Sequence, residues 1–114
     1  MKVIIAGSRN IVDYNTIVSA INSSQFKITC VVSGTARGVD TLGEKWAKEN
    51  KVKIERYPAD WDKHGRAAGY IRNEQMSKVA DALIAIWDGE SKGTKHMIDI
   101  MESINKRVYL YKYI

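Results

Sequence analysis

The stretch that most constrains the fold is Ile28–Asp40, with the sequence ITCVVSGTARGVD. Its first part, Ile28 to Val32, is a short apolar run rich in β-branched residues, which predicts a buried strand. Its second part turns at Gly34 and Gly38 and then begins a helix. The inner face of that helix carries Val39, Leu42, Gly43, Trp46 and Ala47. A strand, a glycine turn and a helix in succession point free backbone N–H groups beyond the sheet, where they can bind an anion. The alternative is a structural connection whose glycines only supply unusual backbone angles.

The rest of the chain repeats this strand-then-helix pattern. The predicted strands are Lys2–Ala6, Ile28–Val32, Val52–Tyr57, Ala82–Trp87 and Arg107–Tyr113. The first helix follows a cap at Asp13, the second follows Gly38, the third spans Ala68–Val79 and the fourth follows Thr94. We expect the first helix to bury Tyr14, Ile17, Val18 and Ile21, and the fourth to bury Met97, Ile100, Met101 and Ile104. Pro58–Ala67 remains a long polar connection, and such connections are often functional or mobile.

Five strands that alternate with four helices predict an α/β fold, a three-layer Rossmann-like sandwich. We expect a five-stranded parallel sheet in the order 3-2-1-4-5, with helices on both faces, as a single domain over residues 1–114. This order puts a switch point between the first and fourth strands, where ligands of such sheets bind.

The charge and the apolar content of the chain limit the classes of partner that it can bind. The 114 residues carry a net charge of +5, which favours an anionic partner without identifying it. The one cysteine, Cys30, lies in a predicted strand, and no apolar run is long enough for a signal sequence or a membrane span. We therefore expect a cytoplasmic protein without a membrane partner. His64 and His96 lack partners at metal-ligand spacing, so we expect both to be solvated and no metal to be bound.

Four separate segments bring glycines or cationic groups to the carboxyl edge of the predicted sheet: Gly7–Arg9, Gly34–Asp40, Arg72–Asn73 and Gly89–Thr94. This convergence indicates a phosphate-binding site. The candidate ligand-binding residues are Gly7, Ser8, Arg9, Ser33, Gly34, Thr35, Ala36, Arg37, Gly38, Asp40, Asp60, Trp61, Arg72, Asn73, Gly93 and Thr94. Neither glycine loop is a dinucleotide fingerprint or a Walker loop, and Ser33 stands where a dinucleotide-binding fold needs an acid. A hydride-transferring dehydrogenase is therefore not expected.

Several of these residues have a structural interpretation beside the functional one. Asp40 either complements the helix dipole or binds a ribose hydroxyl or a neighbouring loop. Trp61 is either a base-stacking lid or a local anchor, and Thr94 fits a helix cap as well as a ligand contact. Arg72 either reaches an anion or ties the Pro58–Ala67 connection to the third helix. The tyrosines Tyr109, Tyr111 and Tyr113 alternate along the last strand, which favours packing over a homo-oligomer surface.

With these residues in hand, the chain resembles the SLOG superfamily of Rossmann-like nucleotide-binding domains, and within it the YspA-type, YpsA-related branch. The residues that carry the resemblance are Val3–Arg9, Ser33–Asp40, Pro58–Trp61, Gly65, Ala68, Gly69, Arg72, Asn73, Met76, Gly93 and Thr94. The resemblance implies a pocket for a nucleotide or a nucleotide-derived small molecule. Its relatives include binders of ADP-ribose-type signals, binders of single-stranded DNA, and phosphoribohydrolases that release a base from a nucleoside monophosphate.

The chain departs from the phosphoribohydrolases at one position. These relatives carry a glutamate three residues after the threonine of their GGxGT loop, whereas this chain has Met97 there, and Glu90 and Ser91 replace the first glycine pair. Our first hypothesis is therefore a binding module for a phosphorylated nucleotide or an ADP-ribose-like molecule, acting as sensor, carrier or sequestering agent without a further cofactor. The alternatives are a hydrolase that uses Asp40, Asp60 or Glu74, and a single-stranded nucleic-acid binder.

Overall fold

The computed structural model describes residues 1–113 and contains one five-stranded parallel sheet in the order β3-β2-β1-β4-β5. The strands are β1 (Lys2–Gly7), β2 (Cys30–Ser33), β3 (Lys53–Arg56), β4 (Ala82–Trp87) and β5 (Arg107–Lys112). The helices are α1 (Tyr14–Ser24), α2 (Val39–Glu49), α3 (Trp61–His64), the 3-10 turn η1 (Gly65–Ala67), α4 (Ala68–Val79) and α5 (Lys92–Ser103). The predicted α/β fold and strand order are thus confirmed.

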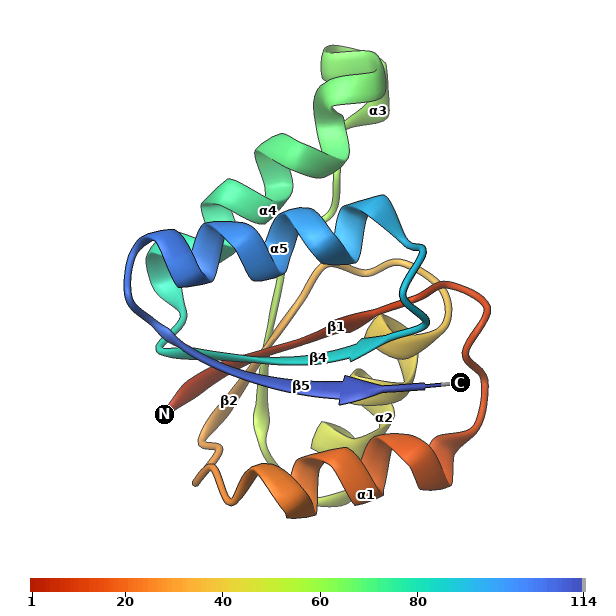
Figure 1. The fold of residues 1–114 in the computed structure, drawn as a ribbon, viewed down its shortest axis with the longest axis vertical. Helices are drawn as coiled ribbons and strands as arrows, with labels where there is room; N and C mark the ends of the chain where they lie inside the picture. The colour runs from red at the N-terminus through yellow and green to blue at the C-terminus, as the bar shows by residue number, and fades with distance from the viewer. Residues whose placement is uncertain (114) are drawn as a thin grey trace.

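Helices cover both faces of the sheet, with α1 and α2 on one face and α4 and α5 on the other (Figure 1). On one face α1 and α2 pack against the sheet through a cluster that includes Ile17, Ile5 and Ile84. On the other face α4 and α5 pack through a second cluster that includes Met76, Met101 and Leu83. The β-branched strand residues alternate between these two clusters, so both faces of each central strand are buried, as is typical of a parallel sheet.

Six strand bounds differ from the prediction by one or two residues: the ends of β1, β2, β3 and β5 and the starts of β2 and β3. β2 begins at Cys30 and not at Ile28, because β1 begins at Lys2 and the first register pair is Lys2 with Cys30. β3 begins at Lys53 and not at Val52, because the N–H of Val52 donates to the carbonyl of Ala47 near the end of α2, at 2.8 Å. It also ends at Arg56, although Tyr57 N still donates to Ser33 O at 2.8 Å. Only the bounds of these strands were predicted wrongly.

The connection Pro58–Ala67 is more ordered than expected, because it contains α3 and η1. Asp60 caps α3 by accepting a hydrogen bond from Lys63 N at 3.1 Å. A single helical turn has too few residues to show a hydrophobic period, so the sequence pattern missed it.

α5 begins at Lys92, three residues earlier than a helix that follows Thr94. Its cap is Ser91, whose Oγ accepts hydrogen bonds from N and Oγ1 of Thr94 at 3.4 and 2.9 Å. Thr94 is therefore not the cap and lies in the first turn. Met97 and Met101 are buried as expected, but Ile98 is buried as well, and Ile104 is 45% exposed at the end of the helix.

The last strand packs only in part as predicted. Tyr109 and Tyr111 are half-buried against the α1 and α2 side, whereas Tyr113 lies beyond β5 and is exposed. Trp46 is half-buried on that same side. Within residues 1–113, no helix has the length and apolar character needed to cross a membrane.

Candidate ligand-binding site

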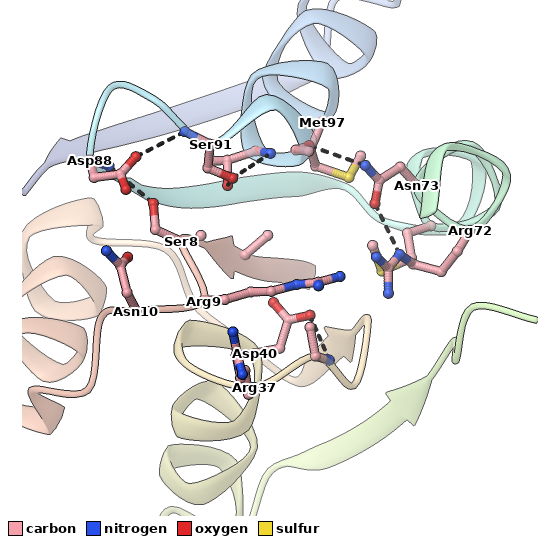
Figure 2. Close-up of a pocket in the computed structure, with 16 residues that line it drawn as sticks. Ser8, Arg9, Asn10, Arg37, Asp40, Arg72, Asn73, Asp88, Ser91 and Met97 are labelled. Atoms are coloured by element: carbon pink, nitrogen blue, oxygen red, sulfur yellow. Dashed lines mark hydrogen bonds between the residues drawn. The ribbon is translucent and has the colours of Figure 1, made fainter. Parts of the chain in front are cut away.

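A cavity of about 360 Å³ lies at the carboxyl ends of β1 and β4, where the chain leaves the sheet in opposite directions (Figure 2). Its walls come from all four segments that the sequence singles out. The lining residues are Ala6, Gly7, Ser8, Arg9, Asn10, Ala36, Arg37, Asp40, Arg72, Asn73, Met76, Asp88, Ser91, Gly93, Thr94 and Met97. We refer to this space as the switch-point cavity.

The loop after β1 is held against the end of β4. Ser8 is buried, its N–H donates to Ile86 O at 3.2 Å, and its Oγ accepts a hydrogen bond from Asp88 N at 3.2 Å. The Ser8 amide is therefore engaged within the protein and is not free to bind a phosphate, contrary to the expectation for this loop. Arg9, by contrast, is exposed and extends across the cavity toward Arg72 (Figure 2).

The loop after β4 contributes two residues that the sequence analysis missed. Asp88 Oδ1 accepts hydrogen bonds from the N–H groups of Glu90 and Ser91 at 2.8 and 2.9 Å, and these bonds hold the pKa of Asp88 below its usual range. Ser91 then caps α5, whose first turn presents Gly93 to the cavity. An acid directly after a predicted strand, followed by a serine three residues before Thr94, is a turn-and-cap pattern that could have revealed both.

The loop after β2 is organised by Asp40. Its carboxylate is buried and accepts a hydrogen bond from Ala36 N at 3.1 Å, so of the alternatives for Asp40 the structure shows the contact with the neighbouring loop. Burial raises the pKa of Asp40 to about 6, while the Ala36 hydrogen bond and the positive charge of Arg72 oppose the rise. Gly38 approaches the loop after β1 so closely that an added Cβ would lie 2.5 Å from Arg9 O.

Ser33 has a structural contact rather than a place in the cavity. Its Oγ donates to Glu44 Oε2 at 2.6 Å and accepts from Thr35 N at 3.1 Å. Glu44 in turn pairs with Arg56 on β3, at 2.9 Å. The hydroxyl thus holds the start of the loop on the sheet.

Arg72 on α4 reaches the loop after β2, since its Nη1 donates to Gly34 O and its Nε donates to Asn73 Oδ1 at 3.0 Å. One of the two predictions for Arg72 was a contact with Pro58–Ala67. Its hydrogen bonds go to Gly34 and Asn73 instead. Burial lowers the pKa of Arg72, and Asp40 opposes this shift. The Nη2 group is left without a protein acceptor within residues 1–113.

Asn73 connects α4 to α5. Its Nδ2 donates to Gly93 O at 3.2 Å and also lies 3.1 Å from His96 Nδ1, which then acts as the acceptor. His96 is half-buried, stacks edge-on against Tyr70 at 4.4 Å, and has its pKa lowered by burial. The prediction that His96 is solvated was wrong, because that contact joins two helices that the sequence does not place together. His64 is half-buried as well.

Two further spaces adjoin the switch-point cavity, and both share Arg9 and Arg72 with it. One, of about 390 Å³, is lined by Arg9, Gly34, Thr35, Ala36, Arg37, Pro58, Ala59, Trp61 and Arg72. The other, of about 180 Å³, is lined by Arg9, Trp61, Arg66, Gly69, Tyr70, Arg72, Asn73 and Gly93. We call them the tryptophan cavity and the tyrosine cavity. Ser33, Gly38 and Asp60 line none of the three.

The charges of the site are unevenly paired. The four ion pairs within 4.0 Å that occur in residues 1–113 do not include Arg9, Arg37 or Arg72. Both carboxylates of the switch-point cavity, Asp40 and Asp88, accept backbone hydrogen bonds. Within the described part of the chain, no group of three or more His, Cys, Asp or Glu residues is arranged to hold a metal ion. The site therefore offers positive charge to an anion.

Comparison with known proteins identifies the family of the chain. The sequence model of the family described as "YspA, cpYpsA-related SLOG family" matches residues 1–64, which run from β1 through α3. "Gene 61 protein" of Mycobacterium phage D29 is 36% identical over an alignment of 105 residues, and the match covers 83% of this chain and 83% of that protein. No solved structure matches the chain.

Proposed function

The chain belongs to the YspA, cpYpsA-related SLOG family, and from this premise we propose that it binds a phosphorylated nucleotide or an ADP-ribose-like molecule at the carboxyl edge of its sheet. Family membership indicates a nucleotide-related function in general. The ligand and its place are our inference from the site. We expect the protein to act as a sensor, carrier or sequestering module for that ligand.

One observation carries the proposal: three arginines that have no ion-pair partner among residues 1–113 line the same cavity as the first turn of a twelve-residue helix. Arg9, Arg37 and Arg72 supply the charge, and α5 supplies N–H groups that have no acceptor within the helix. Arginine recognises phosphate through paired, charge-assisted hydrogen bonds, so this combination suits a phosphate. The switch point of an open parallel sheet is also where such folds bind ligands.

The same cavity favours binding over hydrolysis. Met97, the residue at the place where the phosphoribohydrolase relatives carry glutamate, is buried and forms part of the cavity wall. A thioether cannot accept a proton from water or stabilise an oxocarbenium ion through charge. The two carboxylates in the cavity are already engaged, Asp40 by Ala36 N and Asp88 by the N–H groups of Glu90 and Ser91.

Two measurements test the proposal. Native mass spectrometry of the freshly purified protein should reveal a co-purified nucleotide, and titration with nucleotides should shift the amide resonances of Gly7–Arg9 and Gly93–Thr94. Arg9→Ala should weaken the binding of a nucleoside monophosphate roughly tenfold to a hundredfold, the range for a lost charge-assisted hydrogen bond. Arg9 is the clearest choice because it makes no hydrogen bond that its removal would break in residues 1–113.

Arg107→Ala is the matched control. Arg107 is also an exposed arginine, but it begins β5 and therefore lies at the opposite edge of the sheet. Its replacement should change affinity by less than about twofold. If no nucleotide shifts the loop resonances, or if the two variants bind equally well, the proposed function is wrong.

A further inference from the structure

Trp61 is a large aromatic side chain that folding leaves in water. It is 51% exposed and belongs to neither hydrophobic cluster of the core. One edge of its ring rests near the start of α4, since a Cβ added at Gly69 would lie 3.5 Å from it. This contact explains how the ring is anchored, but it does not explain why about half of this large aromatic residue is exposed to solvent.

The exposed ring of Trp61 lies beside arginine side chains. The Arg9 guanidinium lies over it at 6.0 Å from the ring centre, the outer limit of a cation–π contact. Arg9 also lines the switch-point cavity, so the ring stands beside the group that we expect to contact the phosphate. A guanidinium stacked face to face on the indole would lie roughly 3.5–4 Å from the ring centre. At 6.0 Å Arg9 is therefore not stacked on Trp61, and the exposed indole can receive a planar ring.

The tryptophan cavity is the space in which that ring would lie. Its volume of about 390 Å³ is within the roughly 300–1,000 Å³ typical of small-molecule sites, whereas the tyrosine cavity, at about 180 Å³, is smaller than that range. Three of its lining residues are arginines and none is an aspartate or glutamate. Pro58 and Ala59 add apolar surface beside Trp61.

We propose that the tryptophan cavity is a base subsite, in which Trp61 stacks on the base of a free nucleotide whose phosphate lies beside Arg9 and Arg72. The inference rests on the proposed function and adds to it the recognition of the base. Arg9, Ala36, Arg37 and Arg72 line both cavities, so the two spaces are neighbours and a nucleotide that contacts these arginines can extend from one to the other. A free nucleotide fits better than a nucleic-acid strand, because arginines gathered at one junction neutralise one or two phosphates and not a series of them.

The experiment compares ligands with and without a base. Affinities of adenosine, guanosine, cytidine and uridine 5′-monophosphates, ribose 5-phosphate and a ten-residue oligothymidylate are measured by calorimetry. At least one nucleotide should bind more tightly than ribose 5-phosphate. Trp61→Ala should weaken that nucleotide roughly 5- to 100-fold, as expected for lost stacking, and leave the affinity for ribose 5-phosphate unchanged. Trp61→Phe should retain most of the nucleotide affinity.

Ile104→Ala is the control for loss of an exposed apolar side chain, because Ile104 is 45% exposed and lies at the far end of α5. It should change no affinity. Equal binding of nucleotides and ribose 5-phosphate, or an unchanged nucleotide affinity in Trp61→Ala, would refute the base subsite while leaving the proposed phosphate site intact. A tighter, steeply salt-dependent oligothymidylate complex would also refute it, in favour of a nucleic-acid strand. If none of these ligands binds, the proposed function fails and the subsite with it.

Discussion

Gly38 is the position at which the structure most sharply limits the choice of residue. Its φ of +78° with ψ of −126° lies in a region that L residues rarely adopt, and an added Cβ would lie 2.5 Å from the carbonyl oxygen of Arg9. Both penalties apply to Gly38→Ala. The backbone conformation costs about 1–3 kcal/mol, and the close contact with another backbone adds a similar amount, about 1–3 kcal/mol.

Two other glycines separate these penalties. Gly89 has a φ of +87°, but no atom lies within 4 Å of an added Cβ. Gly89→Ala should therefore cost only the conformational penalty, about 1–3 kcal/mol of unfolding free energy. Gly93 lies in the first turn of α5 with no positive φ and equally open surroundings. Gly93→Ala should therefore leave stability unchanged or raise it by up to about 1 kcal/mol.

Urea unfolding of the three variants measures the effect, with midpoints compared at equal m-values so that only stability differs. The predicted order of stability is Gly93→Ala, then Gly89→Ala, then Gly38→Ala. Because the contact partner of Gly38 is the backbone of Arg9, the same variant should also weaken nucleotide binding. If Gly38→Ala unfolds at the same urea concentration as Gly89→Ala, the close approach of the two loops is not as described and the reasoning is refuted.

Three further predictions concern protons and chemistry. Burial lowers the pKa of His96 from 6.5, and Asn73 donates a hydrogen bond to the neutral ring. The unfolded chain therefore binds more protons below pH 6.5, and the stability of the wild type relative to His96→Gln should be greatest above pH 6.5 and fall as the pH drops below it. Urea midpoints measured across this pH range test the prediction. Burial raises the pKa of Asp40 from 3.8 to about 6, so the folded protein binds more protons in that interval, and wild-type stability relative to Asp40→Asn should fall by up to roughly 3 kcal/mol as the pH rises through it. A slope of the other sign in either series would contradict the assignment. Since Met97 replaces the expected glutamate, incubation with the four nucleoside monophosphates should release no free base on chromatography, and turnover that is lost in Asp40→Asn would show a hydrolase instead.

The sequence predicted the sheet well because its buried strands are marked by local pattern. Ala82–Trp87 is an uninterrupted apolar run between polar residues, and both its bounds are confirmed. The strand order also followed, because the alternation of strands and helices permits few parallel arrangements. Strand ends were less accurate because they depend on where the neighbouring strand begins, as the pairing of Lys2 with Cys30 shows.

The site was predicted as a set of segments but not as a network of contacts. Glycines and arginines after each strand are visible in the sequence, and the switch-point cavity gathers them as expected. The contacts between Arg72 and Gly34, and between Asn73 and His96, join residues 38 and 23 positions apart through side chains, and no local period encodes them. These contacts give Asn73 a different role, because its amide is already engaged by three protein groups and holds the walls of the cavity together.

Because β1 occupies the centre of the sheet, a newly made chain cannot complete its fold in the order in which its residues are synthesised. β1 pairs with β2 on one side, but on the other it waits for β4, and Lys2 N donates to Asp81, 79 residues further along the chain. Until then one edge of β1 is unpaired, and Ile4 and Val32 lack α5, which follows β4 and completes the layer that covers them. The ligand cavity spans the same β1–β4 seam, so it does not exist before α5 has left the ribosome. A small-molecule ligand can therefore stabilise the finished protein, but it has no part in the early stages of its folding.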